Sequence, residues 1–278
     1  MNIYDVSKKA GVSIATVSRV LNGNANVSDK TKNKVLVAMK ELDYTPNIFA
    51  RGLGLNTMKT IGIMCSDSSD TYLANAVYYL EQELRRHNYD SILCCTGQDS
   101  ETKKKYLDLL ISKRVDGIIL AGSQFVLNQP GSDNRYILDA AKEVPIVLAN
   151  GFLPGKNIYS VMCNDTAAVY DATSRLIAAG RRQIVYLYTS TSYSGMNKLK
   201  GYKNALSDAG IPLREEWTHL CTKNIQRAKD YLNTLYDKGI SFDAVVTSDD
   251  SLAVGAVKYA YEHRIAIPEQ LQIIGYNN

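Results

Sequence analysis

Residues 14–22, IATVSRVLN, combine short side chains with a few strong hydrogen-bonding groups. At about 100° per residue, a helix would place Val17, Val20 and Leu21 on one face and Ala15, Ser18, Arg19 and Asn22 on the opposite face. Arginine can donate two hydrogen bonds to guanine O6 and N7, and an alanine methyl can contact the methyl of thymine. The polar face therefore suits the major groove of DNA, although a solvated amphipathic helix would show the same spacing.

The neighbouring segments predict the elements that would position this face. Gly11 can provide a turn after a first apolar segment, and Ser13 is a good N-cap for a helix that begins at Ile14. A third helix is expected after Ser28, with apolar residues at helical spacing, namely Val35, Ala38, Met39 and Leu42. We therefore expect residues 1–45 to form a compact helix-turn-helix headpiece.

Charge is distributed unevenly along the chain. The net formal charge is +4, but residues 1–60 alone carry +5 and the rest carries −1. A basic module in front of a neutral domain is typical of a protein that binds nucleic acid, although a solvated basic surface would give the same count. The lysines of the third helix could contact phosphates or serve only solubility.

The segment from IYDVSKKAGVSIATVSRVLNG to TPNIFARGL resembles the headpiece of the LacI/GalR family of bacterial repressors. The resemblance implies that Ile14 and Ala15 select the operator sequence and that Arg19 contacts a base. It also implies that phosphate contacts or support of the docked headpiece come from Tyr4, Thr16, Ser18 and Asn22.

Residues 46–59 match the family's hinge helix and linker, in which a leucine enters the minor groove. Leu53 occupies that position, and an apolar wedge of this kind kinks the duplex, whereas the alternative is that Leu53 packs on the headpiece. Gly52 and Gly54 depart from the usual hinge, and each glycine in a helix costs about 0.5–1 kcal/mol. We therefore expect a disordered hinge in the free protein and tighter operator binding by a Gly54→Ala variant.

From Thr60 the chain alternates short apolar runs with amphipathic segments, which is typical of parallel strands joined by helices. The expected strands are TIGIMC, SILCC, DGIILAG and PIVLAN, then QIVYLY, DAVVTS and LQIIGY. Helices are expected near 165–179, 195–210 and 250–264. Residues 60–278 should therefore form an α/β domain of two doubly wound parallel-sheet subdomains. These residues also resemble the effector domain of the LacI/GalR family, and the resemblance implies an effector-binding and dimerisation domain similar to periplasmic sugar-binding proteins.

Polar residues follow several of these strands, at the edge where parallel sheets bind ligands. By position in the family the pocket residues are Ser66, Tyr72, Asn150, Lys198, Asp249 and Asn277. Hydroxyl, amide and carboxylate groups beside an aromatic ring suit a sugar, because buried hydroxyls need partners. Asn150 and Asn277 stand where aspartate is frequent, and Lys198 where arginine is frequent. We therefore expect a sugar derivative, with an anionic group near Lys198.

Nothing in the sequence predicts catalysis, a metal or a cofactor. The three histidines lack ligand spacing, and the five cysteines fall mostly in apolar runs, which favours reduced and buried thiols. Common catalytic motifs are absent, and Asp249 and Asp250 are expected to cap a helix rather than act as paired acids. No apolar run is long enough to cross a membrane and the N-terminus lacks a secretion signal, so a cytoplasmic location is expected.

Together these features predict a repressor that binds double-stranded operator DNA as a homodimer and responds to a sugar-like effector. The alternatives are a solute-binding protein without regulatory role, a regulator that responds to purines or nucleosides, and an enzyme of the doubly wound class. The family's effector domain continues beyond the last expected strand. We therefore expect a chain that stops at Asn278 to be a segment of a longer protein or a truncated form.

Overall fold

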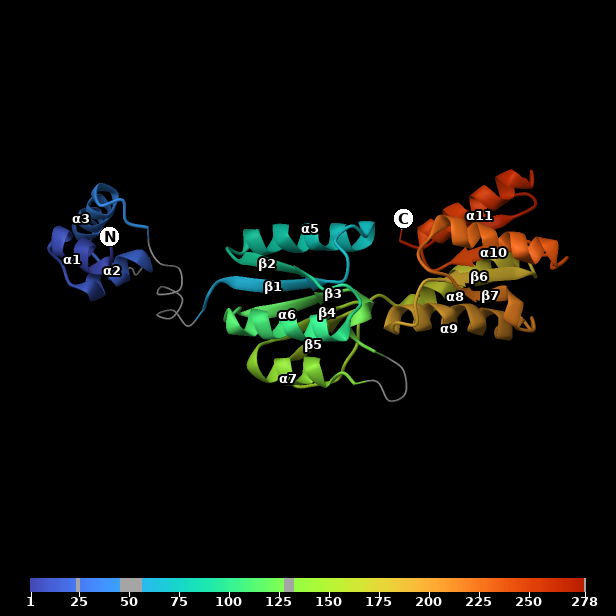
Figure 1. Cartoon of the computed structure of the whole chain (residues 1–278), viewed down its shortest axis with the longest axis horizontal. Helices are drawn as coiled ribbons and strands as arrows, with labels where there is room; N and C mark the ends of the chain where they lie inside the picture. The colour runs from blue at the N-terminus through green and yellow to red at the C-terminus, as the bar shows by residue number, and fades with distance from the viewer. Residues whose placement is uncertain (24–25, 46–56, 128–132, 278) are drawn as a thin grey trace.

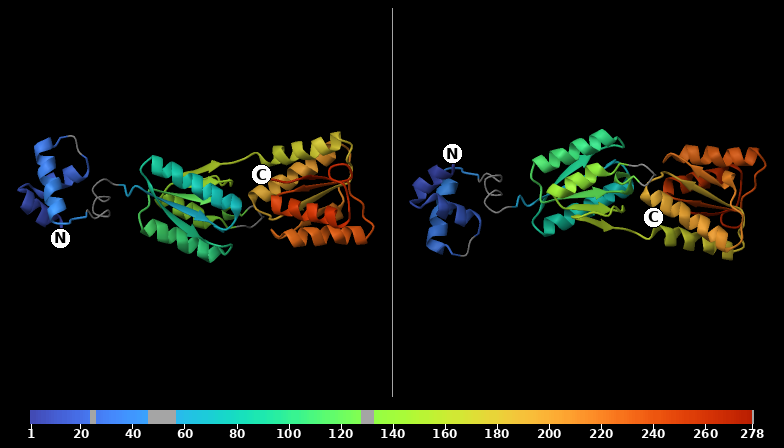
Figure 2. Two further views of the ribbon diagram at one scale, coloured as in Figure 1. Left: turned by 90° about the horizontal axis from the view of Figure 1, so that it is seen from above. Right: turned by 90° about the horizontal axis from the view of Figure 1, so that it is seen from below.

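The computed structural model describes residues 1–23, 26–45, 57–127 and 133–277 of the chain (Figure 1). Most of the predicted hinge, with Leu53, Gly52 and Gly54, lies outside these ranges, so its conformation stays a prediction. The rest divides into three helices at the N-terminus and two α/β lobes, which Figure 2 shows from two further directions.

The headpiece consists of α1 (Ile3–Ala10), α2 (Ile14–Leu21) and α3 (Asp29–Glu41). Gly11 ends α1 in the left-handed conformation, at φ 65°, and Ser13 and Ser28 cap the next two helices as expected. A small core joins the three helices, and its buried members are Val6, Ala10, Val17, Val20, Val35 and Ala38. The predicted helix-turn-helix and its third helix are therefore confirmed.

The first lobe is a five-stranded parallel sheet in the order β2-β1-β3-β4-β5. The strands are β1 (Thr60–Cys65), β2 (Asp90–Cys95), β3 (Gly117–Ala121), β4 (Ile146–Ala149) and β5 (Ile158–Val161). Helix α5 (Thr71–Arg86) covers one face, and α6 (Ser100–Ser112) and α7 (Arg135–Glu143) cover the other (Figure 1). A short turn of 3₁₀ helix, η1 (Ser123–Phe125), follows β3.

The second lobe is a four-stranded parallel sheet in the order β7-β6-β8-β9. Its strands are β6 (Ile184–Tyr188), β7 (Thr218–Leu220), β8 (Ala244–Thr247) and β9 (Gln272–Ile274), and η2 (Glu215–Trp217) precedes β7. One face packs against α8 (Asp165–Ala178) and α9 (Tyr193–Asp208), the other against α10 (Ile225–Asp237) and α11 (Asp250–Glu262).

Successive side chains of the central strands point to opposite faces of the sheet, which explains why helices cover both faces. On β6, Ile184 and Tyr186 face the core shared with α8 and α9, whereas Val185 and Leu187 face the core shared with α10 and α11. Side chains with period two thus fill both faces, which is why the strands read as continuous apolar runs. The two doubly wound subdomains are confirmed, whereas β5, β7 and α10 were not among the expected elements.

The five cysteines differ in their exposure to solvent. Cys65, Cys94 and Cys221 are buried, but Cys95 and Cys163 are exposed, so the prediction of buried thiols is wrong for these two.

The described part of the chain holds no group of three or more His, Cys, Asp or Glu residues arranged to bind a metal ion. Within it, no helix has the length and apolar character that crossing a membrane requires.

Candidate functional site

Helix α2 presents two exposed side chains suited to base contacts. Ala15 and Arg19 are exposed on the face opposite the buried Val17 and Val20, and Ile14 at the helix start is 38% exposed. Arg19 joins none of the ion pairs within the described ranges. Its guanidinium is therefore free to donate hydrogen bonds to a ligand rather than to its own protein.

The other residues predicted to contact DNA lie on α1 and α2. Tyr4 is 68% exposed at the start of α1. Thr16 and Ser18 are half-buried, and the Thr16 hydroxyl lies 2.9 Å from that of the cap residue Ser13. Asn22 closes α2, because its backbone N–H donates to the Ser18 carbonyl at 3.0 Å. Thr16, Ser18 and Asn22 thus belong to the recognition helix or its end, whereas Tyr4 belongs to α1.

A polar cavity of about 390 Å³ lies between the two lobes. The first lobe lines it with Asp70, Tyr72, Leu73, Gln98, Gly122, Ser123, Gln124 and Asn150. The second lobe lines it with Thr189, Ser190, Ser192, Ser194, Gly195, Lys198, Thr222, Lys223, Ser248, Asp249 and Asn277. Both sheets direct the ends of their parallel strands toward this space, which is where open α/β sheets bind ligands.

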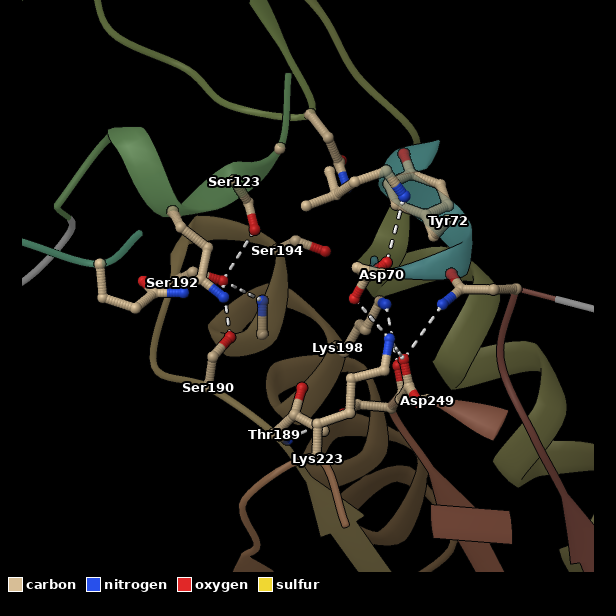
Figure 3. Close-up of a pocket in the computed structure, with 18 of the residues that line it drawn as sticks. Asp70, Tyr72, Ser123, Thr189, Ser190, Ser192, Ser194, Lys198, Lys223 and Asp249 are labelled. Carbon is tan, nitrogen blue, oxygen red and sulfur yellow. Dashed lines mark hydrogen bonds and ion pairs between the residues drawn. The ribbon is translucent and has the colours of Figure 1, made fainter. Parts of the chain in front are cut away.

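Lys223 links the two lobes across this cavity (Figure 3). Its Nζ lies 2.6 Å from Asp70 Oδ2 of the first lobe and 2.8 Å from Asp249 Oδ2 of the second. Burial opposes the charge on Lys223, but its two carboxylate partners outweigh that effect and raise the pKa of its ammonium. Burial likewise opposes the Asp249 carboxylate, but Lys223 and Ser251 outweigh it and lower the Asp249 pKa.

Both carboxylates of this bridge are fixed by helix starts. Asp70 caps α5 by accepting the Leu73 N–H at 3.1 Å, and Asp249 caps α11 by accepting the Ser251 N–H at 3.0 Å. Asn277 approaches the same Asp249 carboxylate, with Nδ2 at 3.5 Å from Oδ2. The expected capping role of Asp249 is therefore confirmed, and it coexists with a place on the cavity wall.

Lys198 forms a second charged group on the wall and is 7% exposed. Its Nζ donates to the Ser248 carbonyl at 3.1 Å and lies 3.5 Å from the centre of the Tyr276 ring. Tyr276 in turn donates its hydroxyl to Asp165 at 2.6 Å. Desolvation lowers the pKa of Lys198, while the charges of Asp165 and Asp249 act in the opposite direction.

Serine hydroxyls form a second contact between the lobes. Ser123 Oγ, after β3, lies 2.8 Å from Ser192 Oγ, which caps α9 (Figure 3). Ser192 Oγ is also 2.8 Å from Ser190 Oγ. Such hydroxyls both donate and accept, so they can exchange these bonds for bonds to the hydroxyls of a ligand.

Five of the six predicted effector residues line the cavity, namely Tyr72, Asn150, Lys198, Asp249 and Asn277. Ser66 is 8% exposed at the end of β1, and it is not among the lining residues. Two further lining residues also follow strands, namely Ser123 after β3 and Thr189 after β6. Lys223 follows β7, a strand that was not predicted.

Comparisons with known proteins agree with both parts of the chain. Residues 2–47 match the model of "Bacterial regulatory proteins, lacI family", and residues 58–278 match "Periplasmic binding proteins and sugar binding domain of LacI family". An HTH-type transcriptional regulator of Lachnoclostridium phytofermentans is 61% identical over 100% of this chain and 83% of its own length.

More distant proteins share the same organisation. The HTH-type transcriptional repressor PurR of Mannheimia succiniciproducens is 31% identical over 99% of this chain and 81% of its own. The crystal structure of the Lac repressor dimer bound to operator and the anti-inducer ONPF has a TM-score of 0.85, at 23% identity. It covers 100% of this chain and 82% of that chain, a likeness that concerns the fold.

Proposed function

The chain belongs to the LacI family of DNA-binding transcriptional regulators, and from this premise we propose that it represses transcription under the control of a sugar-like effector. The observation that carries the proposal is the combination, in one chain, of two features: Arg19 on an exposed helix face, where it joins no ion pair with the described residues, and a polar cavity between two lobes.

The DNA-binding part of the proposal is supported by the exposed face of α2. The small Ala15 permits close approach to a groove, and Arg19 is free to bond a base edge. We propose that Ile14 and Ala15 select the operator sequence and that Tyr4, Thr16, Ser18 and Asn22 hold the backbone. Leu53 would enter the minor groove between two hinge segments.

The proposed assembly is a homodimer on a pseudo-palindromic operator. A dimer places two recognition helices in successive major grooves, about 34–36 Å apart. The solved Lac repressor, which has the same fold, is a dimer bound to operator, and this supports the proposed assembly. Analytical ultracentrifugation with and without the selected operator tests this part.

The cavity chemistry supports an uncharged sugar as the effector. Its wall carries serine and threonine hydroxyls, the amides Gln98, Gln124, Asn150 and Asn277, and the ring of Tyr72. These groups can satisfy the many hydroxyls of a sugar that loses its water on binding. The volume of about 390 Å³ is within the usual range for small-molecule pockets, about 300–1,000 Å³.

The charges of the cavity bear on whether the effector is anionic. The wall carries two ammonium groups, Lys198 and Lys223, and two carboxylates, Asp70 and Asp249, so its formal charges balance. Lys198 already donates to a carbonyl and packs on an aromatic ring. We therefore propose a neutral sugar, in place of the anionic derivative expected from Lys198 alone.

Effector binding would act through the contacts that join the lobes. The Lys223–Asp70 ion pair and the Ser123–Ser192 hydrogen bond both cross the cavity. A ligand that replaces these contacts with its own hydroxyls changes the preferred angle between the lobes, because it binds the two arrangements with different affinity. The lobe angle would then decide whether two hinges and headpieces can dock together.

A thermal-shift screen tests the effector class. The panel contains neutral mono- and disaccharides, sugar phosphates and purine nucleosides at equal concentration. We expect a rise in Tm with a neutral sugar, and its loss in Asp249→Asn but not in the matched surface variant Asp237→Asn. A shift given only by purines, or only by sugar phosphates, would contradict the proposed ligand.

A further inference from the structure

Two cysteines lie side by side on neighbouring strands at the cavity end of the first sheet. Cys65 of β1 and Cys95 of β2 are direct partners in the parallel register. Their sulfur atoms are 3.8 Å apart. Cys65 is fully buried, whereas Cys95 lies on the edge strand and is exposed. The Cys95 thiol is therefore accessible to a reagent in solvent, and the buried Cys65 thiol is in contact with the Cys95 thiol.

The backbone geometry is compatible with a bond between these sulfurs. Adjacent strands are about 4.8 Å apart, which is within the Cα separation of about 4.4–6.8 Å that disulfides span. An S–S bond of about 2.05 Å requires the sulfurs to approach by about 1.7 Å from their 3.8 Å contact. Rotation of the exposed Cys95 side chain about its χ1 angle can supply much of this approach.

From this pair we infer a modification site: Cys65 and Cys95 form a reversible intramolecular disulfide when the protein meets a peroxide. The inference is independent of the effector proposal, because it concerns a different pair of groups. The site nevertheless adjoins the cavity. Thr96 N–H donates to the Cys65 carbonyl and Gly97 N–H to the Ser66 carbonyl, each at 2.9 Å, and Gln98 lines the cavity.

The chemistry begins at the exposed sulfur. The Cys95 thiolate attacks one oxygen of hydrogen peroxide, so an S–O bond forms, the O–O bond breaks, and the other oxygen leaves as hydroxide and takes up a proton to become water. The product is a sulfenic acid. Burial raises the pKa of the Cys65 thiol to about 12, so Cys65 is poorly suited to make this first attack.

The second step joins the two sulfurs. The Cys65 sulfur attacks the Cys95 sulfur, the S–S bond forms as the S–O bond breaks, and the departing hydroxide takes the Cys65 proton and leaves as water. Two thiols are thus oxidised to one disulfide while one peroxide is reduced to two waters. A thiol reductant reverses the reaction by exchange.

Three other cysteines provide controls. Cys94 is adjacent in sequence but its side chain lies in the core on the opposite face of the sheet, with Leu107 and Leu110 of α6. Cys163 is exposed, so it reports on the general reactivity of a surface thiol. Cys221 is buried in the second lobe. Disulfide formation that depends on proximity should therefore spare all three.

Peptide mapping of the oxidised protein tests the inference. The reduced whole chain is treated with a small excess of hydrogen peroxide, remaining thiols are blocked with N-ethylmaleimide, and tryptic peptides are analysed by mass spectrometry without reduction. Cleavage at lysine and arginine places Cys65 in peptide 60–85 and Cys95 in peptide 87–103. We expect these peptides to be linked with the loss of two hydrogen atoms, and dithiothreitol to separate them.

Variants distinguish this pair from other outcomes. The link should persist in Cys94→Ser and Cys163→Ser and disappear in Cys95→Ser, which changes only an exposed position. In Cys65→Ala, dimedone should trap the sulfenic acid on Cys95, provided that circular dichroism shows a folded protein. The inference is overturned if wild-type Cys65 remains a free thiol while Cys163 is oxidised, or if Cys95 instead links two chains.

Discussion

Lys223 and Asp70 form an ion pair that joins the two lobes, with 2.6 Å between Nζ and Oδ2. The pair is partly open to solvent, because the Lys223 side chain is 40% exposed and that of Asp70 is 19% exposed. Asp249 shares the same ammonium and also caps α11. In the proposed mechanism, an effector that competes for Asp249 would disturb this contact between the lobes, and ligand binding would thereby change the lobe orientation.

Replacement of Lys223 by methionine should loosen the lobes. The change removes both ion pairs and leaves two carboxylates close together, so we expect a larger radius of gyration in small-angle X-ray scattering. The free energy of unfolding should fall by about 1 kcal/mol or somewhat more, because solvent reaches the Lys223 ammonium and screens its ion pairs, whereas the two carboxylates are more buried. Lys203→Met, at an exposed position of α9, is the control. An unchanged radius in the Lys223 variant would contradict a restraining role.

Asp249→Asn should remove an acid-sensitive part of the stability while it keeps the helix cap, since asparagine also caps helices. The folded-state pKa of Asp249 is lowered, so its contribution is present above the ordinary value of about 3.9 and is lost as pH falls through the folded pKa. The Tm difference between wild type and variant should therefore be constant near neutrality and shrink in acid. A difference that grows below pH ~4 would have the wrong sign.

Deprotonation of Lys223 should break its ion pairs with Asp70 and Asp249 at high pH. Its folded-state pKa is raised, so its contribution is present below the ordinary lysine value of about 10.4 and is lost as pH rises through the folded pKa. In scattering at increasing pH, the wild-type radius should approach that of Lys223→Met only in strong alkali. Convergence already near neutrality would contradict the assignment.

Much of this arrangement could be predicted from the sequence, for identifiable reasons. Serine caps at 13 and 28 and a glycine at 11 fixed the headpiece helices because capping depends on neighbouring residues. The central strands could also be predicted, because both faces of these strands are buried and their sequences are therefore continuous apolar runs. The short edge strand β7, THL, has no such run, and so the Lys223 that follows it was missed.

The pairs of side chains that face each other across the cavity could not be predicted from the sequence. Asp70 and Lys223 are 153 residues apart and belong to different lobes. Their contact depends on the relative placement of two sheets, which local patterns do not encode. Position after a strand is also an imprecise guide, since Ser66 follows β1 but is buried and is not among the residues that line the cavity.

Arg19→Ala should weaken operator binding by about 1–3 kcal/mol and relax the preference at one base pair. The reason is that Arg19 is exposed and free of ion pairs within the described ranges, so its hydrogen bonds are available to a base. Binding to a library of single-base operator variants measures both effects. Lys34→Ala, on the exposed surface of α3, is the comparison. An equal loss across all sequences would make Arg19 a phosphate contact instead.

Gly201→Ala should destabilise the second lobe through a clash of backbone with side chain. A Cβ at this position would lie 2.3 Å from the Thr166 carbonyl oxygen, where α8 and α9 pack closely. Overpacking of this kind costs about 1–3 kcal/mol, measured as a fall in the free energy of unfolding in urea. Asn204→Ala, exposed on the same helix, should change stability little. If the Gly201→Ala protein is as stable as the wild type, α8 and α9 can move apart without a loss of stability, which would contradict the prediction.

Operator affinity measured with and without a bound effector tests the central proposal most directly. A duplex selected from a random library with the whole chain is titrated at fixed salt, in the absence and presence of the ligand that raises Tm in the screen. We predict that the ligand changes Kd by at least about fivefold, because allosteric coupling is commonly 1–3 kcal/mol. An unchanged Kd at saturating ligand, or the failure of the chain to select any duplex at low salt, would contradict it.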